Sequence, residues 1–130
     1  MNADDGTAGQ DAGRKTVTRI YKICARTAWE KAEPAGQYTG SEVDRRDGFI
    51  HFSTAGQLPG TAARHFAGLA DLVLVAVDSG TLGDALKWEP SRGGELFPHL
   101  YAALSLSAVL WERPLADEIE GRRAFPELVS

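Results

Sequence analysis

The apolar run Leu-Val-Leu-Val-Ala-Val at residues 72–77 constrains the fold of this 130-residue chain more than any other feature. A strand with one wet face alternates apolar and polar side chains, whereas a continuous aliphatic run is typical of a strand covered on both faces. We therefore expect residues 72–77 to form a central strand with packed side chains on each side. Because helices are expected early in the chain and strands late, the predicted fold class is α+β.

Five further segments have the composition of strands, and Pro98 is expected at an edge or a bulge of its strand. They are residues 19–25, 49–53, 86–89, 95–102 and 109–113. A helix is predicted over residues 28–33, where Thr27 and Glu30 match a capping box. A second helix is expected to begin near Ala55. The side chains of this second helix that should face the core are Leu58, Ala62, Phe66 and Leu69.

The chain is expected to hold one domain, since 130 residues fit a single core and no internal linker divides them. Residues 1–17 are rich in Gly, Asp and Ala and are expected to be a disordered lead. Residues 18–115 are expected to form the α+β domain, and residues 116–130 a peripheral tail that is helical or frayed. Residues 37–47 are polar and turn-rich, which predicts an ordered loop.

Charge and composition argue against several kinds of protein. A net charge of -4 does not suit an extended nucleic-acid surface, although a local basic cluster can still bind one phosphate group. No apolar run approaches the ~20 residues that span a bilayer, so no membrane contact is expected and the predicted location is the cytoplasm. The single cysteine, Cys24, is expected to be a buried hydrophobe rather than a reactive thiol. The oligomeric state does not follow from the sequence.

The stretch Gly-Phe-Ile-His-Phe-Ser-Thr, which ends at Thr54, carries unusual polar chemistry for a strand. Because side chains alternate, His51 and Ser53 share a face opposite the apolar Ile50 and Phe52. His51 is the leading catalytic candidate, and the alternative is a structural histidine at a sheet edge. Ser53 is expected to position a ligand, since no Gly-x-Ser-x-Gly motif supports a nucleophile. Thr54 is expected to cap a helix whose N-terminus attracts an anionic group such as phosphate.

A second segment, residues 87–101, places four chemically active side chains among aromatic residues. Glu89 follows a tryptophan, which predicts a raised carboxyl pKa; the alternative is a salt bridge to Arg92. Arg92 lies beside two glycines, where it is expected to clamp a phosphate or to remain a solvated loop charge. His99 and Tyr101 share a strand face and are expected to line a wall, His99 as a catalytic residue and Tyr101 as a ligand contact. The alternative for this pair is a buried, hydrogen-bonded edge.

The remaining motifs give negative predictions. His65 is expected to be partly buried and structural. The three histidines, His51, His65 and His99, lack any local metal-ligand spacing, so no metal is expected. Neither Gly-x-Gly-x-x-Gly nor a P-loop motif is present, which gives no support to a Rossmann domain or a nucleotide triphosphatase.

Several strings in the chain match a family pattern. They are Ile-Tyr-Lys-Ile at residues 20–23, Trp29, Asp-Gly-Phe-Ile-His-Phe-Ser-Thr at 47–54, Leu-Lys-Trp-Glu at 86–89 and Phe-Pro-His-Leu-Tyr at 97–101. With these strings the chain resembles a small bacterial family called domain of unknown function 952, over about residues 19–114. The family name assigns no activity.

The resemblance implies a reduced version of the ADP-ribosyltransferase fold, with a split β-sheet, two or three short helices and a nicotinamide-dinucleotide cleft. That superfamily uses a His or Arg on an early strand, a Ser-Thr or Tyr element on the next, and often a late-strand Glu. His51 with Ser53 and Thr54 resembles the first two elements fused into one stretch. Glu89 is the best acid for the third element, and Glu112 is a poorer one.

The leading hypothesis is a domain that binds a nucleotide-like, phosphate-bearing ligand, with NAD as the candidate cofactor, and transfers or hydrolyses its ribosyl bond. In this transferase-like reaction His51 holds the ribose hydroxyls, while Ser53 and Thr54 position the ligand. Glu89 stabilises the developing oxocarbenium charge, and Arg92 meets a phosphate. One alternative is a non-catalytic ligand-binding or interaction module on the same fold. Another is a small hydrolase that uses two histidines as base and acid.

Overall fold

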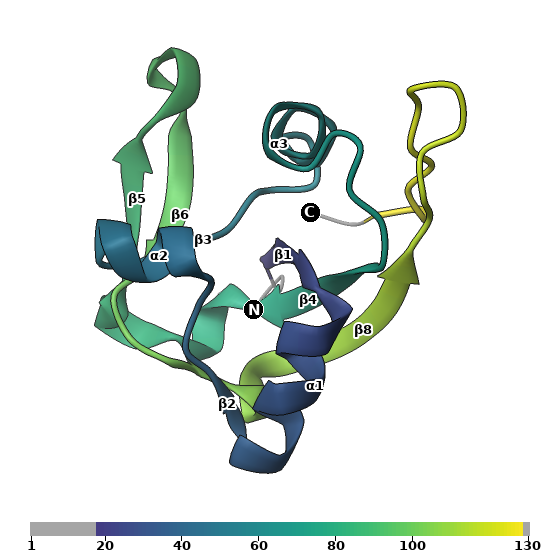
Figure 1. Cartoon of the computed structure of the whole chain (residues 1–130). Helices are drawn as coiled ribbons and strands as arrows, with labels where there is room; N and C mark the ends of the chain where they lie inside the picture. The colour runs from purple at the N-terminus through teal and green to yellow at the C-terminus, as the bar shows by residue number, and fades with distance from the viewer. Residues whose placement is uncertain (1–17, 129–130) are drawn as a thin grey trace, which may run out of the picture.

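The central strand of the molecule is β4 (Leu72–Asp78), which confirms the prediction from the apolar run. The computed structural model describes residues 18–128, so the predicted disorder of residues 1–17 lies outside the described residues. Strand β4 pairs antiparallel with β1 (Arg19–Ala25) on one side and with β8 (Val109–Leu115) on the other (Figure 1).

A second three-stranded sheet contains β3 (Ile50–His51), β6 (Leu96–Leu100) and β5 (Leu86–Pro90), paired antiparallel in that order. The two sheets meet at one antiparallel bridge. There the N–H of Tyr21 donates to the carbonyl of Ser53 at 2.8 Å, and the N–H of Ser53 donates back at 2.9 Å. The fold is therefore α+β with several antiparallel sheets, and the bridge brings β1 next to the residues that follow β3.

Short segments complete the sheets. Strand β2 (Gln37–Tyr38) pairs with β7 (Leu104–Ser105). The β5–β6 hairpin is closed by a 3-10 turn at Arg92–Gly94, in which Gly93 and Gly94 take positive φ angles of 67° and 79°. The paired glycines thus permit the predicted turn, because a side chain is strained in that conformation.

Three helices connect the strands. Helix α1 (Arg26–Ala35) follows β1 directly, and its N-cap is Ala25, which has no capping side chain. The predicted capping box at Thr27 is therefore wrong. The start of the helix is fixed instead by Arg26, whose backbone N–H donates to the carbonyl of Asp71 at 3.0 Å and whose Nε donates to the carboxylate of Asp71 at 2.7 Å.

Helix α3 (Leu58–His65) begins later than predicted but presents most of the predicted face to the core. Leu58 and Ala62 are buried, and Phe66 packs against them at the end of the helix. Leu69 is 50% exposed, so its predicted core position is wrong. The helix ends at His65, and the helical spacing therefore does not extend to Leu69.

Apolar side chains cover both faces of the β1-β4-β8 sheet, as expected for a central strand. One core lies against α1 and the second sheet, and its members include Ile20, Cys24, Trp29, Ile50, Phe52, Val73, Val75, Val77 and Leu100. The other core lies against α3, and its members include Tyr21, Ile23, Leu58, Ala62, Leu72, Leu74, Ala76 and Leu115.

Pro98 lies in the middle strand of the second sheet, so its predicted edge position is wrong. The sheet accommodates it because β3 has only two residues and ends beside it. Phe52 N–H donates to the carbonyl of Pro98 at 3.0 Å, and proline has no N–H with which to return the bond.

The chain after β8 contains no helix over residues 116–128. A backbone bridge joins Ile119 to Arg122, and Phe125 and Leu128 pack against the core beside α3. In residues 18–128, no helix combines the length and the apolar character that crossing a membrane requires.

Candidate functional site

Helix α2 (Glu42–Asp47) carries the first part of the site, within a segment that the sequence predicts as a loop. Ser41 and Asp44 form a capping box. The Ser41 hydroxyl accepts from the Asp44 N–H at 3.1 Å, and the Asp44 carboxylate accepts from the Ser41 N–H at 2.9 Å. Gly48 ends the helix in a left-handed conformation (φ 89°), which turns the chain into β3. The capping box holds the Asp44 carboxylate inward, where its side chain is only 2% exposed.

The Asp44 carboxylate joins three elements of the fold. Lys22, on β1, donates through Nζ to Oδ1 and Oδ2 at 3.1 Å and 2.9 Å. His51, on β3, approaches Oδ1 through ring Nδ1 at 2.6 Å and donates its backbone N–H to the same oxygen at 3.2 Å. Burial would raise the pKa of Asp44, but the hydrogen bonds and charges of His51 and Lys22 outweigh that effect and hold the pKa well below its ordinary value. Asp44 is therefore a permanent negative charge that fixes both partners.

The second ring nitrogen of His51 faces another carboxylate. Nε2 lies 3.0 Å from Oδ2 of Asp47, at the end of α2. Both ring nitrogens can donate at once only in the doubly protonated ring. The Asp47 and His51 side chains are 33% and 34% exposed, so this end of the network is open to solvent, whereas the Asp44 end is closed.

A second carboxylate network lies on β5 and β6. Oε1 of Glu89 lies 2.8 Å from Nδ1 of His99, and the Tyr101 hydroxyl donates to the same oxygen, also at 2.8 Å. These hydrogen bonds, from His99 first and then from Tyr101, lower the pKa of Glu89. The pKa increase predicted from the neighbouring tryptophan is therefore wrong. The bond to Glu89 also raises the pKa of Tyr101.

Phe49 connects the two networks. Its ring stacks on His99 with centroids 4.1 Å apart and an interplanar angle of 25°, and it contacts His51 at 4.6 Å and Tyr101 at 5.2 Å. His51 and His99 are direct register partners, with ring centroids 5.5 Å apart. The structure thus brings together four predicted site residues, His51, Glu89, His99 and Tyr101. We call these four residues and Phe49 the histidine wall.

Positive side chains lie beside the histidine wall. The Arg92 guanidinium lies 4.9 Å above the Phe97 ring, and a Cβ added to Gly60 of α3 would lie 2.9 Å from Nη2 of Arg92. Partial loss of hydration first, and then the charges of Arg64 and Arg92, lower the pKa of His65. Arg92 is thus close to α3 and to His65, although Arg92 and His65 lie far apart in sequence.

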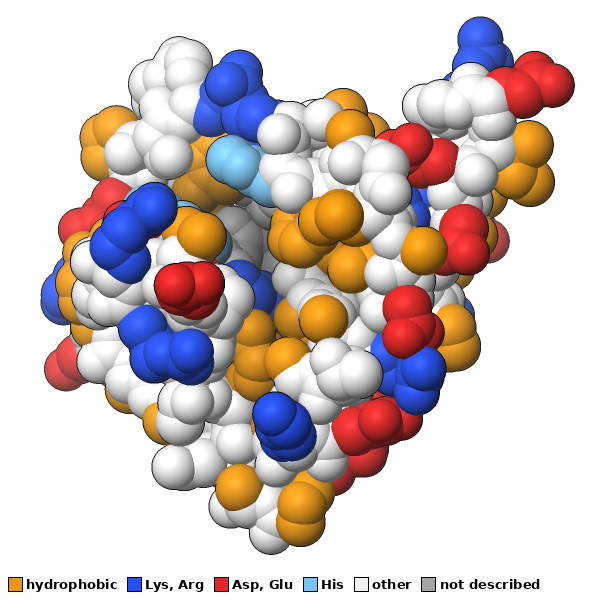
Figure 2. All heavy atoms as spheres, in the orientation of Figure 1, with side chains coloured by type: hydrophobic (Ala, Val, Ile, Leu, Met, Phe, Trp, Pro, Cys, Tyr) orange, Lys and Arg blue, Asp and Glu red, His pale blue; other side chains and the backbone are white. Residues whose placement is uncertain are grey.

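The charges of His51 and Lys22 also lower the pKa of His65. Arg92 lies against Gly60 of α3, the helix that ends with Arg64 and His65, while Lys22 and His51 meet at Asp44. We call Lys22, His51, Arg64, His65 and Arg92 the cation cluster; its members come from β1, β3, α3 and the β5–β6 turn. Figure 2 shows a hollow in the surface. On one side of it lie α2 and the second sheet, and on the other side lies α3. Histidine side chains and Lys or Arg side chains lie at its margin.

Ser53 and Thr54 occupy the junction between β3 and α3. The Ser53 hydroxyl lies 2.8 Å from the Thr61 hydroxyl, and Ser53 is 3% exposed. Thr54 Oγ1 accepts from the Gln57 N–H at 3.2 Å, and Gln57 Oε1 accepts from the Thr54 N–H at 2.9 Å. Both hydroxyls thus have partners within the protein, and their contact with a ligand stays a prediction.

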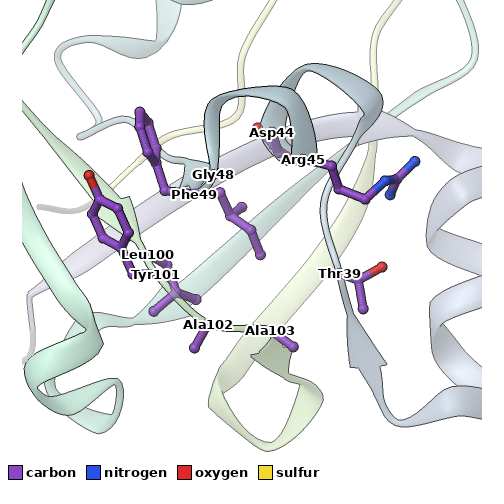
Figure 3. Close-up of a pocket in the computed structure, with 10 residues that line it drawn as sticks. Thr39, Asp44, Arg45, Gly48, Phe49, Leu100, Tyr101, Ala102 and Ala103 are labelled. Carbon is purple, nitrogen blue, oxygen red and sulfur yellow. The ribbon is translucent and has the colours of Figure 1, made fainter.

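A separate groove lies on the other side of Phe49, between α2 and the chain that follows β6 (Figure 3). Its volume is ≈ 370 Å³. Phe49 and Tyr101 lie at one end and Thr39 and Arg45 at the other. The remaining lining residues are Asp44, Gly48, Ile50, Leu100, Ala102 and Ala103.

Four residues of the site are not predicted as site residues from the sequence: Lys22, Asp44, Asp47 and Phe49, although all but Asp44 stand in the family strings. A signal for α2 exists in the string Ser-Glu-Val-Asp at residues 41–44, which fits an N-terminal capping pattern. No sequence signal places Lys22 beside Asp44, because that contact depends on how β1 meets α2. In the described part of the chain, no three His, Cys, Asp or Glu side chains are placed to hold a metal ion together.

Comparisons with known proteins identify relatives. A family model described as a protein of unknown function, DUF952, matches residues 23–112. The crystal structure of protein CC0527 from Caulobacter crescentus is 48% identical, with a TM-score of 0.79 over 82% of this chain and 94% of that chain. The solution NMR structure of CC0527 is 50% identical, with a TM-score of 0.71 over 79% of this chain and 89% of that chain. No curated protein matches the chain significantly.

Proposed function

Because the chain belongs to the DUF952 family, whose function is unknown, we propose an activity from the site alone: the hollow beside the histidine wall binds a phosphate-bearing, nucleotide-like ligand, with NAD as the candidate. The observation that carries the proposal is the cation cluster. The chain has a net charge of -4, yet Figure 2 shows histidine and Lys or Arg side chains at the margin of the hollow. Within residues 18–128, Arg64, His65 and Arg92 of the cation cluster have no carboxylate partner, unlike Lys22 and His51. A local positive field of this kind attracts phosphate groups.

Arg92 is the residue proposed to meet the phosphate. In the described part of the chain, Lys22 and His51 are paired with carboxylates, whereas Arg92 has no carboxylate partner and lies over the Phe97 ring. A guanidinium without a carboxylate partner keeps its planar set of donors for an incoming phosphate. The histidine wall supplies aromatic and imidazole rings on which a flat base or a ribose can rest.

The proposed chemistry is cleavage of a ribosyl bond, on the hypothesis that the split sheet is a reduced ADP-ribosyltransferase fold. The glycosidic bond breaks with its electron pair on the leaving base, and an oxygen of water or of an acceptor bonds to the ribose carbon and releases its proton. Glu89 is suited to stabilise the cationic ribose, because its lowered pKa keeps it negatively charged near neutral pH. His51 would hold the ribose hydroxyls through Nε2, in exchange for its contact with Asp47.

Lys22 changes the proposed assignment of the early-strand basic residue. It lies on β1, whereas His51 lies on the strand segment that continues into Ser53 and Thr54. Lys22 therefore occupies an early-strand position, although it is neither His nor Arg and is buried against Asp44. Its pairing with Asp44 gives it a positioning role toward His51, because Asp44 contacts both.

The alternative proposal is a binding module without chemistry on the same fold. It is favoured by the closed contacts of Ser53 with Thr61 and of Thr54 with Gln57, which leave neither hydroxyl without a protein partner. Both proposals require ligand binding at the cation cluster. They differ in whether NAD is consumed.

The experiment is a titration with ADP-ribose, NAD and inorganic phosphate, followed by thermal unfolding and by NMR of the His65 ring. Binding to the folded state raises the melting temperature by mass action. At a ligand concentration one hundred times Kd, the free energy of unfolding increases by roughly 2.7 kcal/mol. Bound phosphate should also raise the pKa of His65, which burial first and then nearby positive charges lower in the free protein.

Two variants make the experiment specific. Arg92→Gln should weaken ADP-ribose binding about tenfold, the loss expected for a charge-assisted hydrogen bond. Arg122→Gln removes the same charge from an exposed position in the tail and should leave binding unchanged. Release of nicotinamide from NAD separates the enzyme from the binding module. If neither ADP-ribose nor phosphate shifts the melting temperature or the His65 signals, the proposal is wrong.

A further inference from the structure

The groove between Phe49 and Arg45 has features that the cation cluster does not explain. Its volume of ≈ 370 Å³ falls within the usual range of small-molecule sites. Ile50 and Leu100, which line it, are almost fully buried and give it an apolar floor. The groove therefore offers a shaped apolar surface outside the hollow at the cation cluster.

The aromatic end of the groove is held rigidly. Tyr101 is 44% exposed, yet its hydroxyl is fixed by Glu89 at 2.8 Å. Phe49 is fixed by its stack on His99 and contacts the Tyr101 ring at 5.2 Å. Tyr101 is exposed and Phe49 is partly exposed, so the two rings offer a surface for another planar ring. Little conformational entropy would be lost when such a ring binds.

The opposite end of the groove is polar and carries the Arg45 guanidinium; Asp44 also lines the groove, and its carboxylate is paired with Lys22 and His51. Figure 3 shows Arg45 and the Thr39 hydroxyl there, away from the two aromatic rings. Arg45 donates only to the backbone carbonyl of Gly40, whereas its neighbour Arg46 is paired with Asp47 at 3.2 Å. Within residues 18–128, Arg45 has no carboxylate partner, so its remaining N–H donors can serve an anion.

We propose that this groove is a second binding site, for a small molecule that combines a planar aromatic ring with a carboxylate or phosphate group. The ring lies against Phe49 and Tyr101, over the floor formed by Ile50 and Leu100. The anionic group lies toward Arg45. The site shares Phe49 and Tyr101 with the histidine wall. It differs from the site proposed above in its anion contact, which is Arg45 rather than Arg92, so the two anion contacts can be tested separately.

The test is an NMR titration of the protein with benzoate, with its neutral counterpart benzamide and with inorganic phosphate. The aromatic anion should shift the backbone amide signals of Gly48, Phe49, Ala102 and Ala103. Benzoate should bind about tenfold more tightly than benzamide, because the amide keeps one carbonyl acceptor for Arg45 but loses the negative charge and the second acceptor oxygen. Phosphate alone should bind weakly, since it lacks the ring.

Matched variants separate the two ends of the groove. Arg45→Gln should weaken benzoate about tenfold and benzamide much less, while Arg122→Gln should change neither. Tyr101→Ala should weaken both ligands, while Tyr101→Phe, which keeps the ring, should retain them. Well-dispersed amide spectra of each variant confirm that it is folded.

Three outcomes overturn the proposal: benzoate shifts no groove signals at concentrations near its solubility limit, benzoate and benzamide bind equally, or Arg45→Gln binds like the wild type. Shifts confined to Gly60, Arg92 and His65 would place the anion at the cation cluster instead. That result would overturn the groove site and support the proposed function. If benzoate binds in the groove but ADP-ribose does not bind the protein, the groove site is supported and the proposed function is wrong.

Discussion

The carboxylate of Asp44 lies 2.6 Å from Nδ1 of His51, across the boundary between α2 and β3. The same carboxylate binds Lys22 of β1, so one buried negative charge fixes a helix and strands of both sheets. Such a charge is costly to bury and becomes tolerable only when its partners satisfy it. The geometry of the histidine wall therefore depends on a residue that does not itself belong to the wall.

Replacing the buried carboxylate should destabilise the fold strongly. In Asp44→Asn the Lys22 ammonium, whose side chain is 7% exposed, loses its counter-charge. Breaking a buried ion pair from one side costs about 3 kcal/mol or more. Urea unfolding, followed by fluorescence of the three tryptophans, measures this loss directly.

Asp47→Asn is the matched control for Asp44→Asn, because both carboxylates contact the same imidazole. The Asp47 side chain is 33% exposed, and ion pairs of exposed residues contribute about 1 kcal/mol or less. A loss in Asp47→Asn as large as that in Asp44→Asn would show that burial is not the deciding factor.

The lowered pKa of Asp44 predicts how stability depends on acid pH. Its ordinary pKa is 3.8, and the folded-state pKa is well below that value. The unfolded chain therefore takes up a proton first as the pH falls, so the stabilisation is present above pH 3.8 and is lost as the pH falls toward the folded-state pKa. Urea unfolding from neutral to acid pH should give a steeper loss of stability in the wild type than in Asp44→Asn. Equal slopes would contradict the prediction.

The sequence is sufficient to predict the longer strands because their signals are local, whereas the two-residue strands β2 and β7 are not predicted. The apolar run of β4 and the extent of β1 follow from composition and alternation over a few residues. The start of α1 is not predicted, since Arg26 bonds to Asp71, which lies 45 positions away. The middle-strand position of Pro98 likewise depends on where β3 ends, which is a property of the sheet and not of the segment around the proline.

The site divides in the same way. Period-two alternation is enough to put His99 and Tyr101 on one strand face, and the structure joins both to Glu89. The predicted pKa of Glu89 has the wrong direction, because sequence neighbours do not reveal hydrogen-bond donors from the adjacent strand. Asp44 is missed for a related reason: its partners come from β1 and β3, and only the folded chain assembles them.

The single cysteine gives a prediction about reactivity. Burial raises the pKa of Cys24 to about 11, and the residue is 4% exposed. Because the thiolate is the reactive form, a disulfide reagent at pH 8 should label folded protein far more slowly than protein in concentrated urea. Labelling of the folded protein at the rate seen in urea would show that this part of the core opens readily.

Gly60→Ala should separate folding from ligand binding. Gly60 lies in the first turn of α3, where alanine favours the helix by about 0.5–1 kcal/mol, so stability should hold or rise. The new Cβ would lie 2.9 Å from Nη2 of Arg92, and the guanidinium must move away. If Arg92 meets the phosphate, ADP-ribose affinity should fall severalfold while the melting temperature does not. Gly56→Ala is the control, since no atom lies within 4 Å of its added Cβ. Calorimetric titration of both variants with ADP-ribose measures the affinity. If Gly60→Ala binds ADP-ribose as tightly as the wild type, the ligand does not depend on the position of the Arg92 guanidinium beside Gly60.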